Sequence, residues 1–316
     1  MKKSVWLLVL YCLFSAAAGL AAELVNYLPK NAEVVFSLKN LNTSSAWRSL
    51  IKTYQGKIAQ HQDDPNYLLL SYLFKQFTFK QVAGGSFPAE AGWKNILVVF
   101  PDLEGEKERF NKFLIDNLGN FVSINPGWSK KESNQQEIYF DSEAERNDRL
   151  TAFSVQEGRV ILASNSGLVS TCLAAARTGS NVVQTAAFKE LSSAIPKGYE
   201  GYIFINNQSR RFSQELKKWE TDNKMVVLLS GQWLESLLLT FSLVTDDEVK
   251  GKLFFKCSDP AKVKLMQNDA QFLGEVIKRK YAYSQLVYNH TVSVQGNKVI
   301  LDFTARNFKA ILDKEL

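Results

Sequence analysis

The sequence predicts an α+β fold built as a tandem duplication, with two pseudo-symmetric halves that each contain a mixed or antiparallel sheet and packed helices. Two observations lead to this prediction: similar segments recur in the same order in both halves, and both halves alternate short apolar runs with amphipathic stretches. The recurring segments are Leu28-Pro29-Lys30 with Ile195-Pro196-Lys197, 94–100 with 250–256, 154–156 with 293–295, and 159–162 with 298–301. Because each copy of an ordered repeat corresponds to one structural unit, the two halves should share one topology.

The repeat divides the chain into four parts. We expect a signal peptide at 1–22, a first α+β repeat at 23–180, a linker helix at 181–194 and a second α+β repeat at 195–316. The linker contains the short stretch from Ala186 to Leu191, whose apolar face should dock on the rest of the protein. The two units should therefore be packed together as one body.

Each unit should open with a strand followed by a helix. The strands are short apolar runs, and polar residues that favour helix caps stand between each strand and its helix. Aromatic residues recur in both helices at helical spacing, which is typical of a core-facing stripe and not of a ligand-binding box. These aromatic residues are Trp47, Tyr54, Phe212 and Trp219. The expected strand and helix ranges are 34–38 and 42–54 in the first copy, and 202–205 and 208–219 in the second.

A hairpin and a second helix should follow in each copy. In the second copy the hairpin is marked by the polar turn Thr245-Asp246-Asp247-Glu248, and the helix by Pro260, which suits a first helical turn. The hairpin strands are expected at 78–87 and 95–100, and at 239–244 and 252–256. The helices are expected at 104–118 and 260–277.

The last block of each copy should be a three-stranded meander and a closing helix. Glu157-Gly158 and Gly296-Asn297 are two-residue turns of the kind that join hairpin strands. The polar extra segments 60–66 and 119–135 of the first copy should be surface insertions. The strands are expected at 137–140, 151–156 and 159–163, and at 284–288, 291–295 and 298–303, with closing helices around 168–175 and 308–312.

The N-terminus predicts export. A basic head at Lys2 and Lys3, an apolar run from Val5 to Phe14 and a small-residue tail are typical of a secretory signal peptide, with cleavage after Ala21 or Ala22. The apolar run is too short to span about 30 Å of hydrocarbon, although an uncleaved anchor remains an alternative. We therefore expect a periplasmic or extracellular protein that is not transmembrane after cleavage.

Charge and cysteine content narrow the range of partners. The formal net charge of +6 falls to about +4 when Lys2 and Lys3 leave with the signal, and no stripe of arginine interleaved with aromatics suggests nucleic acid. The mature chain keeps Cys172 and Cys257. One falls in a predicted helix and the other ends a predicted strand in the other copy, so we expect free, buried thiols.

Three short patterns resemble the motifs of serine acylases of the penicillin-binding class. They are Ser49 with Lys52, Ser123-Ile124-Asn125, and Arg177-Thr178-Gly179. The chemistry requires the last triplet on an edge strand beside the nucleophile, whereas here it ends a predicted helix. Three short patterns are expected by chance in a chain of this length, so we assign no acylase site.

Histidines and metal ligands are sparse. The two histidines, His61 and His290, lie far apart in the sequence and form no pair with zinc-ligand spacing. His61 stands near Asp63 and Asp64, where a solvated loop is a better interpretation than a cation site. No residue is assigned as catalytic, cofactor-binding or metal-binding, and no cofactor is expected.

Two segments resemble a family of exported bacterial proteins of unassigned function. They are Leu28-Pro29-Lys30-Asn31-Ala32, which leads into a strand, and Ala187-Phe188-Lys189-Glu190-Leu191, which leads to Ile195-Pro196 and another strand. The resemblance implies a bacterial envelope protein and transfers no catalytic residues.

Two function classes remain. The first, which we expect, is a non-enzymatic envelope protein that binds a partner protein, a lipid or a glycan through the cleft between the copies. The second is a hydrolase with a non-standard site in the same cleft. A pocket in which a serine, an acidic residue and His61 or His290 converge would favour the hydrolase, and an apolar groove would favour the binding protein.

Overall fold

The computed structural model describes residues 24–58, 78–88, 93–101, 127–133, 135–142, 151–156, 158–196, 198–223, 230–281 and 285–308, together with 108, 112 and 116. Its strands are β1 (Val34–Lys39), β2 (Phe79–Pro88), β3 (Trp93–Pro101), β4 (Trp128–Ser133), β5 (Gln136–Asp141), β6 (Ala152–Gln156), β7 (Arg159–Ala163), β8 (Gly201–Asn206), β9 (Leu234–Thr245), β10 (Glu248–Cys257), β11 (Val287–Gln295) and β12 (Lys298–Arg306). The α-helices are α3 (Ser45–Ile58), α6 (Ser166–Thr178), α7 (Ala186–Ser192), α8 (Arg211–Asn223) and α9 (Val263–Lys280).

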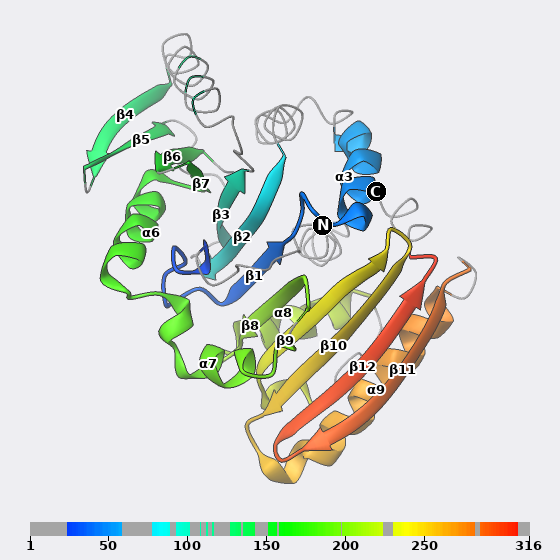
Figure 1. The fold of residues 1–316 in the computed structure, drawn as a ribbon. Helices are drawn as coiled ribbons and strands as arrows, with labels where there is room; N and C mark the ends of the chain where they lie inside the picture. The colour runs from blue at the N-terminus through cyan, green and yellow to red at the C-terminus, as the bar shows by residue number, and fades with distance from the viewer. Residues whose placement is uncertain are drawn as a thin grey trace.

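The twelve strands form a single antiparallel sheet in the order β11-β12-β10-β9-β8-β1-β2-β3-β7-β6-β5-β4 (Figure 1). The predicted α+β class with an antiparallel sheet is therefore confirmed. At its centre β1 pairs with β8, and Phe36 stands opposite Ile203. Outward from this pair the order is β2, β3, β7, β6 on one side and β9, β10, β12, β11 on the other, and the first side continues with β5 and β4.

Helices cover both faces of the sheet. Side chains of successive strand residues point to opposite faces, so Val34 and Phe36 join a different apolar cluster from Val35. The Val34 face carries α3, whose Trp47 and Leu50 are buried, and further along it α9 packs over β11 and β12. The Val35 face carries α6, α7 and the segment from Leu24 to Leu28.

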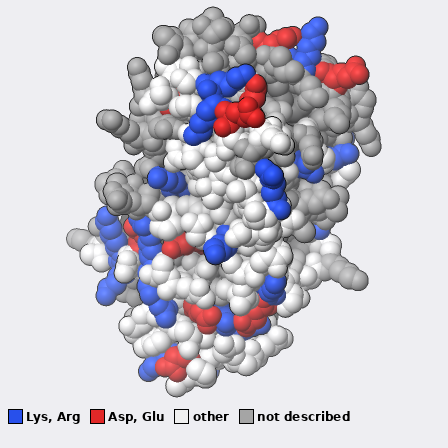
Figure 2. All heavy atoms as spheres, turned by 90° about the vertical axis from the view of Figure 1, so that its left-hand side faces the viewer, with Lys and Arg blue, Asp and Glu red and all other residues white. Residues whose placement is uncertain are grey.

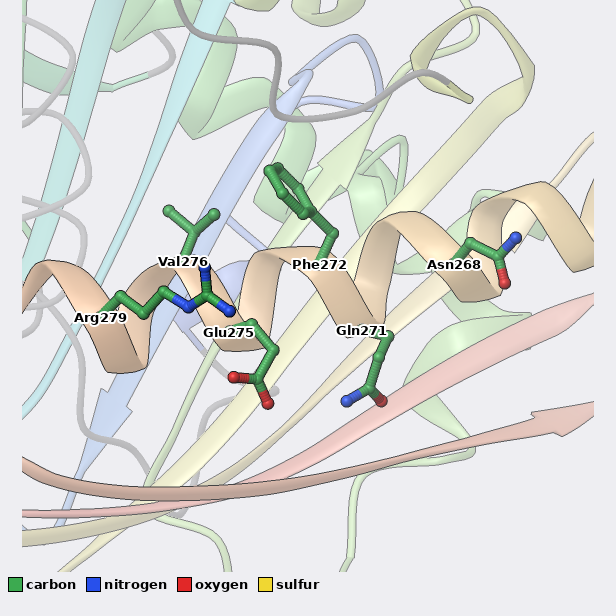
Figure 3. Close-up of a pocket in the computed structure, with 6 residues that line it drawn as sticks. All are labelled: Asn268, Gln271, Phe272, Glu275, Val276 and Arg279. Atoms are coloured by element: carbon green, nitrogen blue, oxygen red, sulfur yellow. The ribbon is translucent and has the colours of Figure 1, made fainter.

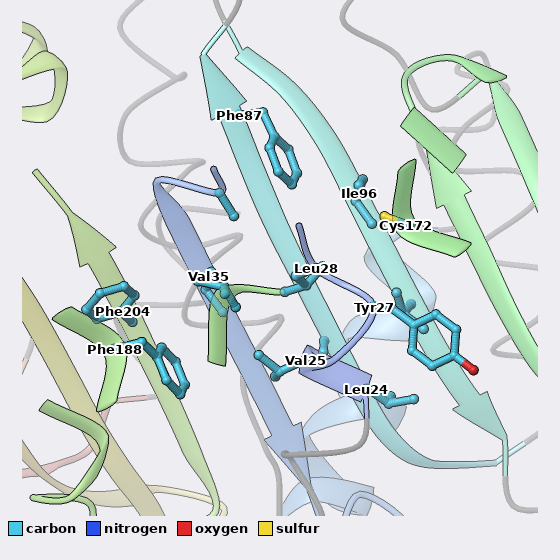
Figure 4. Packing of buried hydrophobic residues seen from close by; sticks show 14 of the residues in the cluster. Leu24, Val25, Tyr27, Leu28, Val35, Phe87, Ile96, Cys172, Phe188 and Phe204 are labelled. Atoms are coloured by element: carbon cyan, nitrogen blue, oxygen red, sulfur yellow. The ribbon is translucent and has the colours of Figure 1, made fainter. Parts of the chain in front are cut away.

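The core on the Val35 face includes the segment from Leu24 to Leu28 (Figure 4). Leu24, Val25 and Leu28 are buried there, and the Leu28 carbonyl accepts a hydrogen bond of 2.9 Å from the Val182 amide in the linker. The linker helix α7 docks as expected, with Phe188 packed edge-on against Phe204 at a ring distance of 5.2 Å.

Two sequence-based predictions about strands are wrong. The segment 119–135, expected to be an insertion, contains β4, because Trp128 packs on Phe153 and Lys130 pairs with Glu137 of β5. The ranges 284–288 and 291–295, expected to be separate strands, belong to the single strand β11 apart from 284–286. The intervening Asn289-His290 has neither glycine nor proline to form a turn, and the His290 ring packs against α9 at Gly274.

Other expected features lie outside the described residues, or nearly so: segment 60–66, most of helix 104–118 and the C-terminal helix after residue 308. The side chains of Tyr54 and Trp219 are also outside the described part, whereas Trp47 is buried and Phe212 packs partly buried near α9, as expected. Cys172 and Cys257 are free and buried, which confirms that prediction. No described helix is long and apolar enough to span a membrane.

Candidate functional site

The serine-acylase patterns do not converge. Ser49 lies on α3, on the Val34 face of the sheet, whereas Arg177-Thr178-Gly179 ends α6 on the opposite face. Gly179 adopts the left-handed conformation of a helix C-cap, with a φ of 70°, which accounts for the glycine without catalysis. Ser123 and Asn125 lie outside the described residues.

Polar groups do meet where α3, from the first half of the chain, contacts the β9–β10 turn of the second half. The Ser49 hydroxyl donates a hydrogen bond of 2.8 Å to Oδ2 of Asp246 in the β9–β10 turn. Beside it, Oε2 of Glu200 accepts hydrogen bonds from the Trp47 indole at 3.0 Å and from the Leu243 amide at 3.1 Å. A serine beside a carboxylate becomes a strong nucleophile when an imidazole takes its proton.

The described histidine is not placed to serve that serine. His290 lies on β11, and β12 separates β11 from β10. Its ring packs under α9, where Nε2 lies 3.1 Å from Nε2 of Gln271 and 4.0 Å from Oε1 of Glu275. A Cβ at Gly274 would overlap the ring, so glycine allows the helix to approach the strand. His290 therefore fastens α9 to β11, and His61 lies outside the described residues.

The cysteines are not poised for chemistry. Burial raises the pKa of both the Cys172 and Cys257 thiols, which disfavours the reactive thiolate. Within the described residues, no three histidine, cysteine, aspartate or glutamate side chains gather into a group that would hold a metal ion.

Two lysines on the Val35 face, Lys256 and Lys298, are paired with acidic side chains. Nζ of Lys256 lies 2.7 Å from Glu190 and 2.8 Å from Glu235, and Lys298 lies 3.4 Å from Glu190. The hydrogen bond from Lys256 lowers the pKa of Glu190. On the side of the molecule shown in Figure 2, blue and red side chains of the described residues lie interspersed, which does not favour a polyanionic partner there.

Exposed apolar residues gather on the last helix and the last hairpin. Four large apolar side chains of the described residues are strongly exposed, and three of them belong to α9 or β11. They are Val244 (47% exposed), Phe272 (52%), Val287 (49%) and Val294 (41%). We call the surface formed by β11 and the exposed side of α9 the α9–β11 edge.

A shallow groove of about 360 Å³ follows α9 within this edge. Phe272 and Val276 project from one side of the helix, and Gln271 and Glu275 from the other (Figure 3). Asn268 and Arg279 complete the lining, so the groove offers an apolar strip with polar and charged groups beside it. Such a surface suits a protein partner better than a reaction.

The strand β11 is itself unusual as a sheet edge. It is nine residues long and contains no aspartate, glutamate, lysine, arginine or proline. The opposite edge strand, β4, has six residues and carries Lys130, Lys131 and Glu132. Short, charged edge strands are a common protection against pairing with another chain. Among the described strands, one edge of the sheet is therefore protected and the other is open.

Similarity to known proteins extends to the fold alone. A solved structure described as crystal form I of TP0453 aligns with a TM-score of 0.51 and 14% sequence identity, over 92% of this chain and 94% of that chain. The long antiparallel sheet with its helices is thus a fold that exists in a solved protein. No protein-family model and no curated protein matches the sequence.

The sequence interpretation missed the α9–β11 edge because it divided β11 into two strands. The usable signal was the absence of glycine and proline between Tyr288 and Thr291. With one strand there, β11 ends the sheet, whereas a separate strand at 284–288 was expected to lie beside it.

Proposed function

We propose that this protein is an exported bacterial envelope protein that acts by binding a partner through the α9–β11 edge and not by catalysis. The observation that carries the proposal is the uncharged strand β11, which has no second neighbour among the described strands and carries the exposed Val287 and Val294. The serine and acidic groups that do meet, Ser49 and Asp246, have no described imidazole beside them, which disfavours the hydrolase alternative.

Export is supported by the N-terminal sequence, and cleavage at the expected sites is compatible with the described core. Leu24 and Val25 are almost fully buried, and both follow the expected cleavage sites after Ala21 or Ala22. Cleavage at either site therefore leaves Leu24 and Val25 in the mature protein. A mature protein that starts at Ala22 or Glu23 keeps the packing shown in Figure 4.

We also propose that the fold arose by tandem duplication, with a two-fold axis between β1 and β8. The sequence offset that carries Leu28 onto Ile195 also carries Phe36 onto Ile203. These two residues stand opposite each other in the central strand pair. A two-fold axis through that pair would exchange them, as equivalent positions require.

The hydrogen-bond register supports the same duplication strand by strand. Starting from the central pair, each step to the next strand on one side has a matching step on the other. The matched positions are Gly84 with Leu239, Leu97 with Leu253, Leu162 with Leu301, and Phe153 with Val292. Where the recurring sequence segments lie on these strands, they match the same pairs of residues. Sequence similarity and backbone pairing are independent observations, so their agreement supports the duplication.

The proposed function is tested by site-specific photo-crosslinking in the native host. A photo-reactive amino acid at Val294 should give a discrete adduct in the envelope fraction, and the same amino acid at the equally exposed Val244 should not. Mass spectrometry of the same fraction should find the N-terminus at residue 22 or 23. A cytoplasmic protein with intact Met1, or labelling of Ser49 by a fluorophosphonate, would argue against the proposal.

A further inference from the structure

We propose that β11 accepts an antiparallel β-strand donated by a partner polypeptide, in the place that β5 fills beside β6 in the first half. This inference rests on the proposed function and names the chemistry of the partner. Sheet-edge addition of this kind relies on main-chain hydrogen bonds for affinity and on alternating side chains for specificity.

In the first half of the chain, the equivalent position beside the strand is occupied by β5. Strand β6 occupies the same place in the strand order as β11, and the matched register equates Ser154 with Ser293. However, β6 is not an edge, because β5 pairs with it through Ile138 opposite Ser154 and Tyr139 opposite Phe153. The second half of the chain has no described strand in the position of β5.

Equivalent residues of β6 and β11 differ in burial, as expected if β11 lacks the neighbouring strand that β6 has. Ser154 is fully buried and donates a 2.7 Å hydrogen bond to the main-chain carbonyl of Glu137 on β5, whereas Ser293 is exposed. Val155 packs against the apolar cluster, whereas its counterpart Val294 is 41% exposed. The exposed hydroxyl and the exposed valine are thus the groups that a strand in the place of β5 would cover.

The main chain of β11 is also set to receive a strand. The turn Gly296-Asn297 makes Gln295 and Lys298 the closing hydrogen-bonded pair of the hairpin. Hydrogen bonding alternates along an antiparallel strand, so the N–H and C=O groups of Tyr288, His290, Val292 and Val294 point to the open edge. In the first half, the counterpart of His290 is Thr151, whose carbonyl accepts a 2.9 Å hydrogen bond from Asp141 at the end of β5.

The expected occupant is an extended segment with an aromatic or large apolar residue opposite Val292. In the first half this place is taken by Tyr139, which stacks on Phe153 at a ring distance of 5.1 Å. Because β11 contains no aspartate, glutamate, lysine or arginine, it would not repel a charged residue of the incoming strand.

The probe for this site is the capped peptide of residues 134–142, which contains β5 itself. Fluorescence anisotropy with the mature protein should show saturable binding of the labelled peptide, and a scrambled peptide should not bind. Asp141 donates to β6, so the amides of Tyr139 and Asp141 should face the acceptor strand. N-methylation at Tyr139 should therefore abolish binding, and N-methylation at Phe140 should leave it nearly unchanged.

Substitutions on the protein test the register. Continuing the β5–β6 pairing by one residue puts Glu137 opposite Val155, and hence opposite Val294 in the complex. Val294→Glu should weaken peptide binding by about tenfold, because like charges face each other, and Val294→Lys should strengthen it. Val244→Glu, at an equally exposed valine away from the edge, is the control and should change binding less than about twofold.

Three outcomes would overturn the inference: no peptide binding, equal effects of the two N-methylated peptides, or a dimer of the wild-type protein that Val294→Glu dissociates. The last result would assign the edge to a second copy of this chain. If crosslinking at Val294 still gives a discrete adduct while the peptide fails to bind, the proposed function stands and strand donation is wrong.

Discussion

Replacing Trp47 should reveal how strongly α3 joins the two halves of the sheet. Trp47 is 2% exposed on the Val34 face, and its indole N–H donates to Glu200, which follows the linker. Trp47→Ala removes the buried ring and should lower the free energy of unfolding by about 3–5 kcal/mol. Trp47→Phe keeps most of the ring but loses the hydrogen bond to a carboxylate, and should cost about 1.5–3 kcal/mol. Glu200 still accepts from Leu243, which favours the lower end of that range.

The assay is urea unfolding of the mature protein followed by far-ultraviolet circular dichroism. Because β1 and β8 belong to one sheet, both halves should unfold in a single transition. Arg48→Ala, at the exposed neighbour on the same helix, is the control and should stay within about 0.5 kcal/mol of the wild type. The reasoning is refuted if Trp47→Ala costs less than about 1 kcal/mol, or if the phenylalanine and alanine variants are equally destabilised.

Three further predictions concern separate parts of the molecule. Gly274→Ala should destabilise the protein by about 1–2 kcal/mol despite the better helix propensity of alanine, because the new Cβ overlaps the His290 ring. Adding His290→Ala should relieve most of this loss, and additive effects in the double variant would contradict the packing. The hydrogen bond from Lys256 lowers the pKa of Glu190, so the stabilisation of the folded protein by this pair is present above the ordinary pKa of 4.5 and is lost as the pH falls through the lowered pKa of the folded state. In urea titrations, Lys256→Met should reduce the loss of unfolding free energy at acid pH by about 0.2–1 kcal/mol, and an unchanged loss would disprove the role of the pair. The purified protein should form no fluorophosphonate adduct, and stoichiometric labelling that disappears in Ser49→Ala would restore the hydrolase alternative.

Local patterns in the sequence were sufficient for most of the described elements. The apolar runs of β1, β7 and β8, the turn Gly296-Asn297 and the docking face of α7 follow from periodicity and turn chemistry. Strand β4 escaped this reasoning because, after Trp128, it is formed by lysine, serine and glutamate and shows no apolar alternation. The candidate site escaped it because an edge is a property of the whole sheet: whether β11 has one neighbour or two depends on which distant segment lies beside it.

The amino-acid sequence alone was therefore enough to predict the α+β class, the order and type of most described elements, the buried aromatic residue on α3 and a duplication. These features depend on residues close together in the chain, where spacing and composition carry the signal. Three features required the three-dimensional fold: the pairing of β1 with β8, the contact of Ser49 with Asp246 across the two halves, and the position of the uncharged β11 at the end of the described sheet. Each of these depends on contacts between residues far apart in sequence, whose geometry is settled by the burial of whole faces of the sheet.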